Sequence, residues 1–430
     1  MNTTSGFPVN DKRIINGWAL FDWANSSFAL VVTAAIFPAY YAAVVDDTVS
    51  IFGTKVSDSS LYAYAISAAY LLVAAMSPLL SGVADYSGRK KFFLKIFTTV
   101  GSLACMALFF FTGQVVYGTL VFIVAMMGFA GGLVFYNSYL PVIVTEDRYD
   151  SVSARGFAYG FIGSVILLII NLIMIQKYDW FGFKDQGIAT RFAFLTVGVW
   201  WLGFSQIPFR RLPQDSKKKT GEKLLAKGFQ ELKKVLRSVR GEQNIRRFLL
   251  AFLCLSAGVQ TALYLAATFA EKELGFETSE LILTILILQI VAIAGAILFA
   301  KVSEWKGNKF ALLVILVIWI LTCTFAYTIT TKSQFYIVAI SVGMLMGATQ
   351  SLSRSTYSKL LPKGTTDTAS YFSFYDVTEK MATVFGTFIF GYINYLTGSM
   401  RLSVLSLSVF FMLALVFLIG AKIQHLKVER

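Results

Sequence analysis

The sequence predicts an all-α membrane protein with twelve transmembrane helices in two pseudo-symmetric six-helix bundles. Three observations support this fold class. The 430 residues are 56% hydrophobic and only 14% charged, whereas about 25% of the residues in an ordinary soluble domain are charged. The apolar residues gather in long runs, each sufficient to cross a bilayer core of roughly 30 Å. Short motifs in the first half of the chain also recur in the second half.

The apolar runs number twelve, and short polar loops separate most of them. They cover 15–44, 61–84, 92–113, 117–144, 156–176, 190–209, 248–270, 279–302, 309–330, 335–361, 369–396 and 401–423. The one long polar stretch follows the sixth run. We therefore expect an N-terminal six-helix bundle in 1–209, a basic cytoplasmic linker in 210–247 and a C-terminal six-helix bundle in 248–430.

The distribution of lysine and arginine predicts the orientation. Thirty of the 38 basic residues fall at the two termini, in every second loop and at the inner end of the tenth run. The opposite side holds seven: Lys55, Lys177, Lys184, Arg191, Lys272, Lys332 and Arg401. Cytoplasmic loops carry the excess of positive charge. Both termini should therefore be cytoplasmic, and two termini on the same side require an even number of spans, as predicted here. We expect a multi-pass protein of the cell inner membrane.

The linker contains a second kind of helix signal. Apolar residues repeat there at helical spacing with basic residues around them: Leu225, Phe229, Leu232, Leu236 and Val239. This pattern predicts a cationic amphipathic helix on the inner membrane surface. Attraction to anionic lipid explains it, and a regulatory or partner-binding role is the alternative.

The first apolar run carries polar groups on one face. Trp18, Asp22, Asn25 and Ala29 share that face of a helix. A carboxylate at the centre of a membrane helix costs about 2.5–3.5 kcal/mol and is tolerated where it faces protein or a water-filled cavity. The face therefore predicts a cavity, and the alternative is that Asp22 reaches water near the headgroups.

Composition also excludes several functions. The net charge of +14 lies in short loops between apolar runs rather than in a nucleic-acid-binding motif. The single histidine, His425, lies in the C-terminal tail, so a histidine triad or multi-histidine metal site within the membrane is excluded. Three cysteines in apolar runs have no metal-binding spacing. No G-x-x-x-x-G-K-[ST] loop for ATP occurs. We expect no enzyme activity, cofactor, metal or nucleic acid.

Two motifs occur once in each half. Positions after the second run recur after the eighth with an offset of 219 residues: Asp85, Gly88 and Lys90 correspond to Glu304, Gly307 and Lys309. The sequence YNSYLP at 136–141 resembles YSKLLP at 357–362. Weak repeats of this kind are typical of transporters built from two related bundles with the substrate site between them.

The segment 82–91, GVADYSGRKK, resembles the loop signature of the major facilitator superfamily (MFS). The resemblance implies a cytoplasmic gate, for which the candidate residues are Gly82, Asp85, Gly88, Arg89, Lys90, Glu304 and Gly307. Gly88 permits a tight turn, and Asp85 has the charge to pair with Arg89 or to face a helix N-terminus. The alternative is a basic turn that serves only the charge asymmetry.

Four further segments indicate which branch of the superfamily the sequence resembles. GWALFDWANSSF, YNSYLP, SARGFAYG from Ser153 and QSLSRS from Gln350 together resemble the vacuolar-effluxer-like branch of the MFS. That branch includes the yeast autophagy-related amino-acid effluxer, so the resemblance implies a transporter of small molecules with amino acids as the best-known cargo. Val142 stands where an acidic residue is expected after the proline, which puts the same substrate in doubt.

Helices 1, 4, 7 and 10 line the cavity in this superfamily. The candidate substrate-binding residues are accordingly Asp22, Asn25, Tyr136, Asn137, Gln260, Gln350 and Arg354. Arginine is suited to bidentate binding of a carboxylate, but Arg354 has an alternative role as a residue that snorkels to the interface. The amides have the alternative role of joining helices.

The eleventh run carries a charged cluster, Asp376, Glu379 and Lys380, at positions i, i+3 and i+4. Such a cluster is costly in a membrane unless it is paired or hydrated. We hypothesise that Asp376 or Glu379 carries a coupling proton. The alternative is a static ion pair between Asp376 and Lys380 near the cytoplasmic mouth.

These features predict a secondary active transporter, expected to act as a monomer, that moves a small polar solute by alternating access. Its expected partners are the small-molecule substrate, membrane lipids and, on the coupling hypothesis, protons. Two alternatives stay open: the same fold with a lipid or amphipathic metabolite as cargo, and a membrane sensor without transport.

Overall fold

The computed structural model describes residues 7–46, 48–51, 54–216 and 224–423. His425, the end of the C-terminal tail and residues 217–223 of the linker lie outside the described residues. Within the described part, eleven helices are long and apolar enough to cross a membrane. The remaining predicted span, the eleventh, is the 30-residue helix α14 (Thr368–Thr397), which carries Asp376, Glu379 and Lys380. Phe388 and Tyr395 on α14 are 70% and 84% exposed, as on a surface that faces lipid.

The chain folds into two compact units. Unit 1 comprises Met1–Tyr139 and Tyr159–Phe229, and unit 2 comprises Leu140–Ala158 and Gln230–Arg430. Two helices are divided between them: α7 (Tyr149–Gln176) begins in unit 2 and continues in unit 1, and α9 (Leu224–Gly241) begins in unit 1 and ends in unit 2. The sequence-based division at 209 and 248 stays a prediction.

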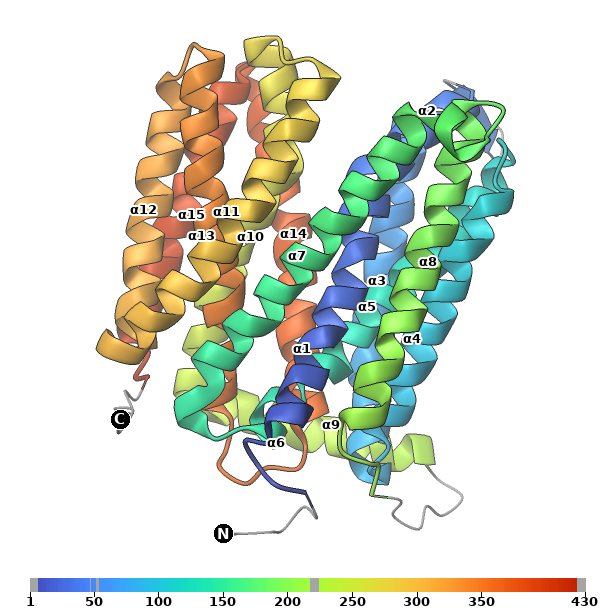
Figure 1. The fold of residues 1–430 in the computed structure, drawn as a ribbon. Helices are drawn as coiled ribbons and strands as arrows, with labels where there is room; N and C mark the ends of the chain where they lie inside the picture. The colour runs from blue at the N-terminus through green and yellow to red at the C-terminus, as the bar shows by residue number, and fades with distance from the viewer. Residues whose placement is uncertain (1–6, 47, 52–53, 217–223, 424–430) are drawn as a thin grey trace. The chain divides into compact units, whose positions relative to one another are not determined.

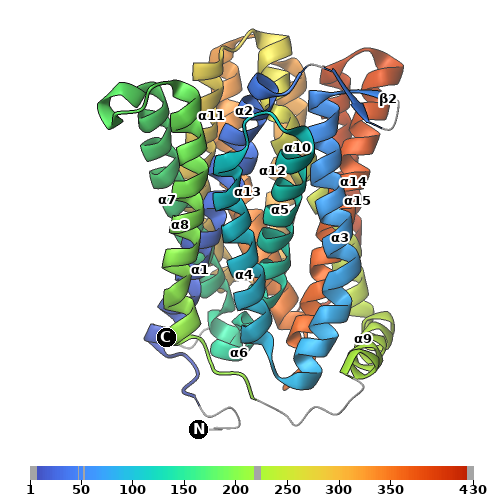
Figure 2. The same ribbon diagram turned by 90° about the vertical axis from the view of Figure 1, so that its right-hand side faces the viewer.

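Unit 1 holds the first six spans. The first span combines α1 (Lys12–Ser27), a π-helix (Phe28–Ile36) and α2 (Phe37–Val44); the others are α3 (Asp58–Ser87), α4 (Lys90–Ala107) with a 3₁₀ turn (Leu108–Phe110), α5 (Val115–Asn137), most of α7 and α8 (Gln186–Arg211). A 3₁₀ turn (Tyr178–Phe181) joins α7 to α8. Within this unit α4 packs against α5 and α8, and α3 packs against α5 (Figure 2).

Unit 2 begins with the short helix α6 (Leu140–Ile143), a 3₁₀ turn (Glu146–Arg148) and the start of α7. Its long helices are α10 (Gln243–Leu274), α11 (Thr278–Lys306), α12 (Asn308–Thr328), α13 (Lys332–Leu360), α14 and α15 (Met400–Gly420). They run side by side, with α11 against α13 and α15 against both α10 and α12 (Figure 1). The part of α9 in this unit lies crosswise to them (Figure 1).

Each unit has an aromatic core. In unit 1 the Phe37 and Phe122 rings stack with centroids 4.4 Å apart, and Phe28 stacks on Trp201 at 5.4 Å. In unit 2 Trp319 stacks on Phe411 at 5.0 Å. Aromatic pairs contribute to stability beyond the area they bury. Side chains remote in sequence therefore fix the helices that carry the polar residues.

The sequence did not predict two local features. A two-stranded antiparallel hairpin, β1 (Thr48–Ile51) and β2 (Thr54–Ser57), precedes α3. The first span also changes from α-helix to π-helix at Phe28 and returns to α-helix at Phe37. π-helical segments are rare and often occur at functional sites. No residue pattern in 28–36, which reads FALVVTAAI, distinguishes this segment from an ordinary apolar helix.

Candidate transport site

In unit 1 the polar face of the first span is anchored by Tyr136. The Tyr136 hydroxyl donates a hydrogen bond to the Asp22 carboxylate at 2.7 Å. The Trp18 indole Nε1 donates to the Tyr136 carbonyl oxygen at 3.0 Å. The rings of Trp18 and Phe21 stack on Tyr136 at 4.6 and 4.7 Å. Asp22 and Tyr136, two of the predicted site residues, therefore meet, and Asp22 is held in a buried position rather than at an exposed helix end.

The position of α1 depends on two glycines in α7. A Cβ on Gly160 would lie 2.6 Å from the Ser26 hydroxyl, and a Cβ on Gly163 would lie 2.7 Å from the Trp23 carbonyl oxygen. Both distances are shorter than real Cβ contacts, so only glycine allows this approach. The backbone that carries Asp22 is consequently packed directly against α7.

Asn25 is one turn further along α1 and differs from Asp22 in its surroundings. Its side chain is completely buried, and neither its Nδ2 nor its Oδ1 has a hydrogen-bond partner among the described residues. Buried amides almost always form hydrogen bonds, so an unsatisfied one needs a specific explanation. The π-helix begins three residues later, at Phe28. A free donor, a free acceptor and an irregular backbone therefore coincide in the first span.

The other candidate in unit 1 is Asn137. It is the last residue of α5 and is half-buried. Adjacent residues of a helix point about 100° apart, so Asn137 does not share the direction of Tyr136.

In unit 2 Arg354 is one of the largest fully buried side chains, with 2% of its surface exposed. Its Nε donates to the Ser153 hydroxyl at 2.9 Å and its Nη2 donates to the Ser153 carbonyl oxygen at 2.8 Å. The guanidinium also stacks over the Phe157 ring at 4.1 Å. Arg354 is therefore anchored to the start of α7 and does not snorkel to an exposed surface.

The charged cluster of α14 also has fixed partners. Lys380 Nζ pairs with Asp376 Oδ1, as the i, i+4 spacing predicted. The second oxygen of Asp376, Oδ2, is buried and has no hydrogen-bond partner among the described residues. Tyr375 stacks on Phe252 at 4.1 Å, which fixes this turn of α14 against α10. Glu379 is half-buried on the same helix.

The two remaining candidates, Gln260 on α10 and Gln350 on α13, are both half-buried. Gln350 lies one helical turn before Arg354, so the two share a face of α13. Gln260 lies on a different helix of the same unit. Both glutamines therefore stay candidate substrate-binding residues on the basis of their position alone.

The segment 82–91 forms the turn between α3 and α4. Gly88 has a φ of 67°, which favours glycine, and ends α3. Asp85 pairs with Lys90 Nζ at 3.0 Å, a partner that the sequence analysis did not name. The acid at the N-terminus of α4 is Asp215, whose oxygens accept from the backbone N–H groups of Lys91 and Phe92 at 2.8 and 3.0 Å.

Asp215 was not singled out from the sequence. It follows α8 by four residues but caps α4, 124 positions earlier in the chain. Burial raises the pKa of Asp215, although the two backbone hydrogen bonds and the nearby Lys91 and Lys95 oppose that shift. A polar residue just after a span looks like an ordinary loop residue, so only the tertiary structure reveals this contact.

The related segment of unit 2 is built around a different acid. Gly307, with a φ of 90°, joins α11 to α12, and the neighbouring Ser303 and Asn308 both donate to Asp150 of α7, at 2.8 and 2.7 Å. Lys359 of α13 pairs with Asp150 at 2.6 Å and donates to Asn308 Oδ1 at 2.7 Å. Glu304, the predicted equivalent of Asp85, is only half-buried.

Comparison with known proteins identifies the family. Residues 10–430 match the family described as "Vacuole effluxer Atg22 like". An uncharacterized MFS-type transporter of Bacillus subtilis, YxiO, is 31% identical, over 94% of this chain and 93% of its own length. Autophagy-related protein 22 of Kluyveromyces lactis is 24% identical, over 98% of this chain and 95% of its own.

Solved structures show the same fold. The proton:xylose symporter XylE superposes with a TM-score of 0.71 at 14% identity, over 95% of each chain. The human organic anion transporter MFSD10 superposes with a TM-score of 0.73 at 11% identity, over 96% of this chain and all of its own. At these identities the likeness concerns the fold alone, and it confirms the predicted fold class. The chain belongs to the Atg22-like vacuole effluxer family, a group of MFS secondary transporters rather than enzymes.

Proposed function

We propose that this transporter moves a small polar solute of the amino-acid class by alternating access. The observation that carries the proposal is the Asn25 side chain, which is buried with both polar atoms unpartnered. A carboxamide in this state offers the two N–H donors of Nδ2 and the acceptor oxygen Oδ1 to a ligand. Asp22, one turn earlier on the same face, adds negative charge in a fixed position.

This combination suits a zwitterion. An α-amino group would be attracted by the Asp22 carboxylate, and an α-carboxylate would accept a hydrogen bond from Asn25 Nδ2. A site built to hydrogen-bond a polar group strongly rejects an analogue that lacks it, because the buried protein group then stays unpaired. We therefore expect recognition of the amino-acid backbone atoms by α1.

The test is counterflow in proteoliposomes with a panel of labelled amino acids, glucose, uridine and a dipeptide. We expect exchange of at least one amino acid and a loss of tenfold or more in Asn25→Ala. Asn171→Ala is the matched control, because Asn171 is also a fully buried asparagine of unit 1 but lies on α7. We expect it to keep exchange within twofold of the wild type. Equal losses in the two variants, or exchange of none of the amino acids, would refute the proposal.

We further propose that the Asp376 carboxylate carries a coupling proton. Protonation would break its pair with Lys380, and its unpartnered Oδ2 supports this assignment because it leaves one oxygen available. A static ion pair remains the alternative. An imposed pH gradient should accelerate wild-type transport but not transport by Asp376→Asn, which should keep counterflow. The double variant Asp376→Asn/Lys380→Met removes both charges. It therefore controls for misfolding that an unpaired Lys380 would cause in Asp376→Asn. A full response to the gradient in both variants would exclude Asp376.

The same experiment tests Glu379, the other candidate proton carrier of α14. Glu379→Gln should lose the response to the gradient only if Glu379 rather than Asp376 is the proton carrier. Asp367→Asn is the control, because Asp367 lies just before α14 and pairs with Lys234 of α9. It should retain the response.

We also infer that α9 contacts anionic lipid at the cytoplasmic surface of the inner membrane. Leu225 and Phe229, which share one face of α9, are 63% and 58% exposed. Lys233 and Arg237, which follow at the same i, i+4 spacing, are also exposed. A helix with an uncovered apolar stripe next to a basic stripe is suited to a membrane interface. Transport in liposomes should rise with the fraction of phosphatidylserine, and Lys233→Gln/Arg237→Gln should lower that dependence. No dependence on lipid charge would contradict the inference.

A further inference from the structure

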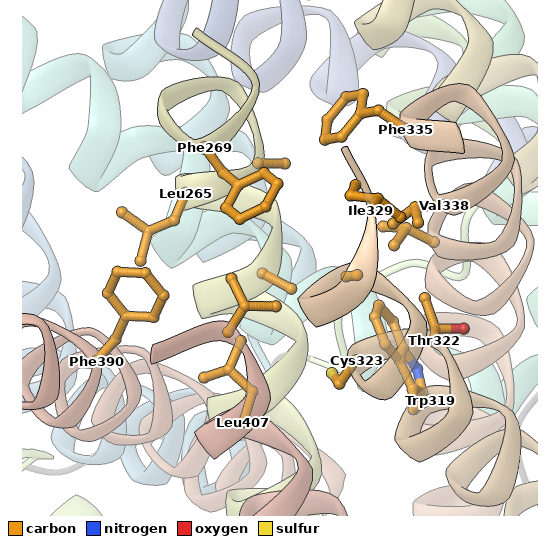
Figure 3. Close-up of a pocket in the computed structure, with 15 residues that line it drawn as sticks. Leu265, Phe269, Trp319, Thr322, Cys323, Ile329, Phe335, Val338, Phe390 and Leu407 are labelled. Atoms are coloured by element: carbon orange, nitrogen blue, oxygen red, sulfur yellow. The ribbon is translucent and has the colours of Figure 1, made fainter. Parts of the chain in front are cut away.

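Unit 2 contains an apolar cavity of about 60 Å³ between its helices. Its wall comes from α10, α12, α13, α14 and α15 (Figure 3). Aromatic rings form much of the wall: Phe269, Trp319, Phe335 and Phe390. About 10–15 Å³ on this scale admits one water-sized group. The cavity therefore has room for roughly four to six such groups.

The polar atoms of the wall are already satisfied. The Trp319 Nε1 donates to the Thr349 hydroxyl at 3.2 Å. The Thr322 hydroxyl donates to the Ile318 carbonyl oxygen at 2.8 Å and also lies 2.7 Å from the Ser341 hydroxyl. Water in the cavity would gain almost no hydrogen bond, and apolar cavities of this kind stay dry and bind apolar molecules.

The wall of the cavity is not buried evenly. Phe269, Trp319, Phe335 and Leu407 are buried, whereas Ala262, Leu265 and Ala266 of α10 and Val404 of α15 are only partly buried. The end near Phe269 and Ile329 is closed by Arg401, whose guanidinium pairs with Glu273 at 2.8 Å and donates to the Ile329 carbonyl oxygen. A guest would therefore reach the cavity at the partly buried residues of α10 and α15.

We propose that this cavity binds the terminal segment of an aliphatic chain. The volume, the apolar wall and the dryness of the cavity match a few methylene groups ending in a methyl group. Two sources have this chemistry: the acyl chain of a bilayer lipid and the tail of an amphipathic solute. The cavity lies within unit 2, whereas Asn25 belongs to unit 1.

The test uses the fluorescence of Trp319, which lines the cavity, and bromine, which quenches indole at contact. The protein is placed in nanodiscs whose phospholipids carry bromine at the ends of their acyl chains. The chain has seven tryptophans, so the Trp319 signal is the difference between the wild type and Trp319→Phe. We expect brominated chains to quench this difference signal by at least half.

A pair of matched variants locates the quenching. Ala266→Leu fills the cavity, and Ala267→Leu makes the same change at the next residue, which is exposed outside the cavity. Ala266→Leu should abolish quenching of the Trp319 signal, and Ala267→Leu should retain it. The melting temperature of each variant shows that it is folded.

A second arm separates the two sources. Unbrominated nanodiscs receive a short-chain carboxylic acid with bromine on its last carbon. Quenching with brominated lipid assigns the chain to the bilayer, and quenching only with the added acid assigns it to a solute. Quenching in neither arm, or unchanged quenching in a more heat-stable Ala266→Leu variant, shows a mere packing void and overturns the proposal.

Discussion

Lys359 and Asp150 form a buried ion pair in unit 2, with Nζ 2.6 Å from Oδ2 and side chains only 8% and 1% exposed. Asn308 and Ser303 complete the hydrogen bonding of the Asp150 carboxylate. Charges this deeply buried are tolerated only when they are paired and hydrogen-bonded. Three long helices of unit 2, α11, α12 and α13, thus converge on one residue at the start of α7.

Lys359→Met should strongly destabilise the protein, because it leaves Asp150 buried without its charge partner. The expected loss in the free energy of unfolding is about 3–5 kcal/mol. Asp150→Asn/Lys359→Met should recover part of it, since neither buried charge remains. Thermal unfolding with a thiol-reactive dye measures these changes, because Cys105, Cys254 and Cys323 are all buried in the folded chain.

The control for this pair is Lys332→Met. Lys332 pairs with Glu280 at the same distance, 2.6 Å, but the two side chains are 41% and 29% exposed. Exposed pairs contribute about 0–1 kcal/mol. Equal destabilisation by Lys359→Met and Lys332→Met would show that burial does not govern the Asp150 pair.

Tyr136→Phe should remove the hydrogen bond to the Asp22 carboxylate while keeping the ring that stacks with Trp18 and Phe21. A hydrogen bond to a charged group contributes about 1.5–3 kcal/mol, and we expect a loss of that order in the free energy of unfolding. Tyr117→Phe is the control, because the Tyr117 hydroxyl donates only to the Ala107 backbone carbonyl. A loss in Tyr117→Phe as large as that in Tyr136→Phe would contradict a special role for Asp22.

Gly228→Ala should disturb the contact between α9 and α3. A Cβ at this position would lie 2.8 Å from the Val83 backbone nitrogen, which costs about 1–3 kcal/mol as overpacking. Gly241→Ala, at the other end of α9, meets nothing within 4 Å and should be neutral or slightly stabilising. Limited proteolysis of α9 and the melting temperature report both effects. Equal behaviour of the two variants would refute the close contact.

The contact of α9 with the start of α14 should depend on pH. Burial raises the pKa of Asp367, but the hydrogen bonds with Lys234 and Glu231 and the charge of Lys234 together outweigh burial, so the pKa lies below its usual value. The hydrogen bonds with Asp367 and Glu231 raise the pKa of Lys234. Stability from Asp367 is therefore present above its unfolded pKa of about 3.9 and is lost as the pH falls through the lower folded value.

The contribution of Lys234 to stability depends on pH in the opposite direction. It is present below the unfolded pKa of about 10.4 and is lost as the pH rises through the higher folded value. Because Lys234 is 66% exposed, Lys234→Met should cost no more than about 1 kcal/mol near pH 7. The difference in melting temperature from the wild type should shrink above pH 11. A difference that stays constant there would contradict the pairing.

The sequence alone determined the spans. Hydrophobicity and length are local properties, and the length needed to cross a bilayer is the same everywhere in the chain. All twelve predicted runs therefore correspond to helices, including α14 with its charges. The pairing of Asp376 with Lys380 was predictable for the same reason, because i, i+4 neighbours meet on any helix.

Only the tertiary structure decided which polar group meets which. Asp150 contacts Lys359 at a sequence separation of 209 residues, and Asp215 contacts Lys91 at a separation of 124. No local sequence pattern predicts contacts between residues so far apart in the chain. The same applies to the π-helix after Asn25 and to the cavity beside Trp319, which depend on how neighbouring helices pack. The hydropathy of a segment determines whether it crosses the membrane, but the side chains of other segments determine which partners its buried charges have.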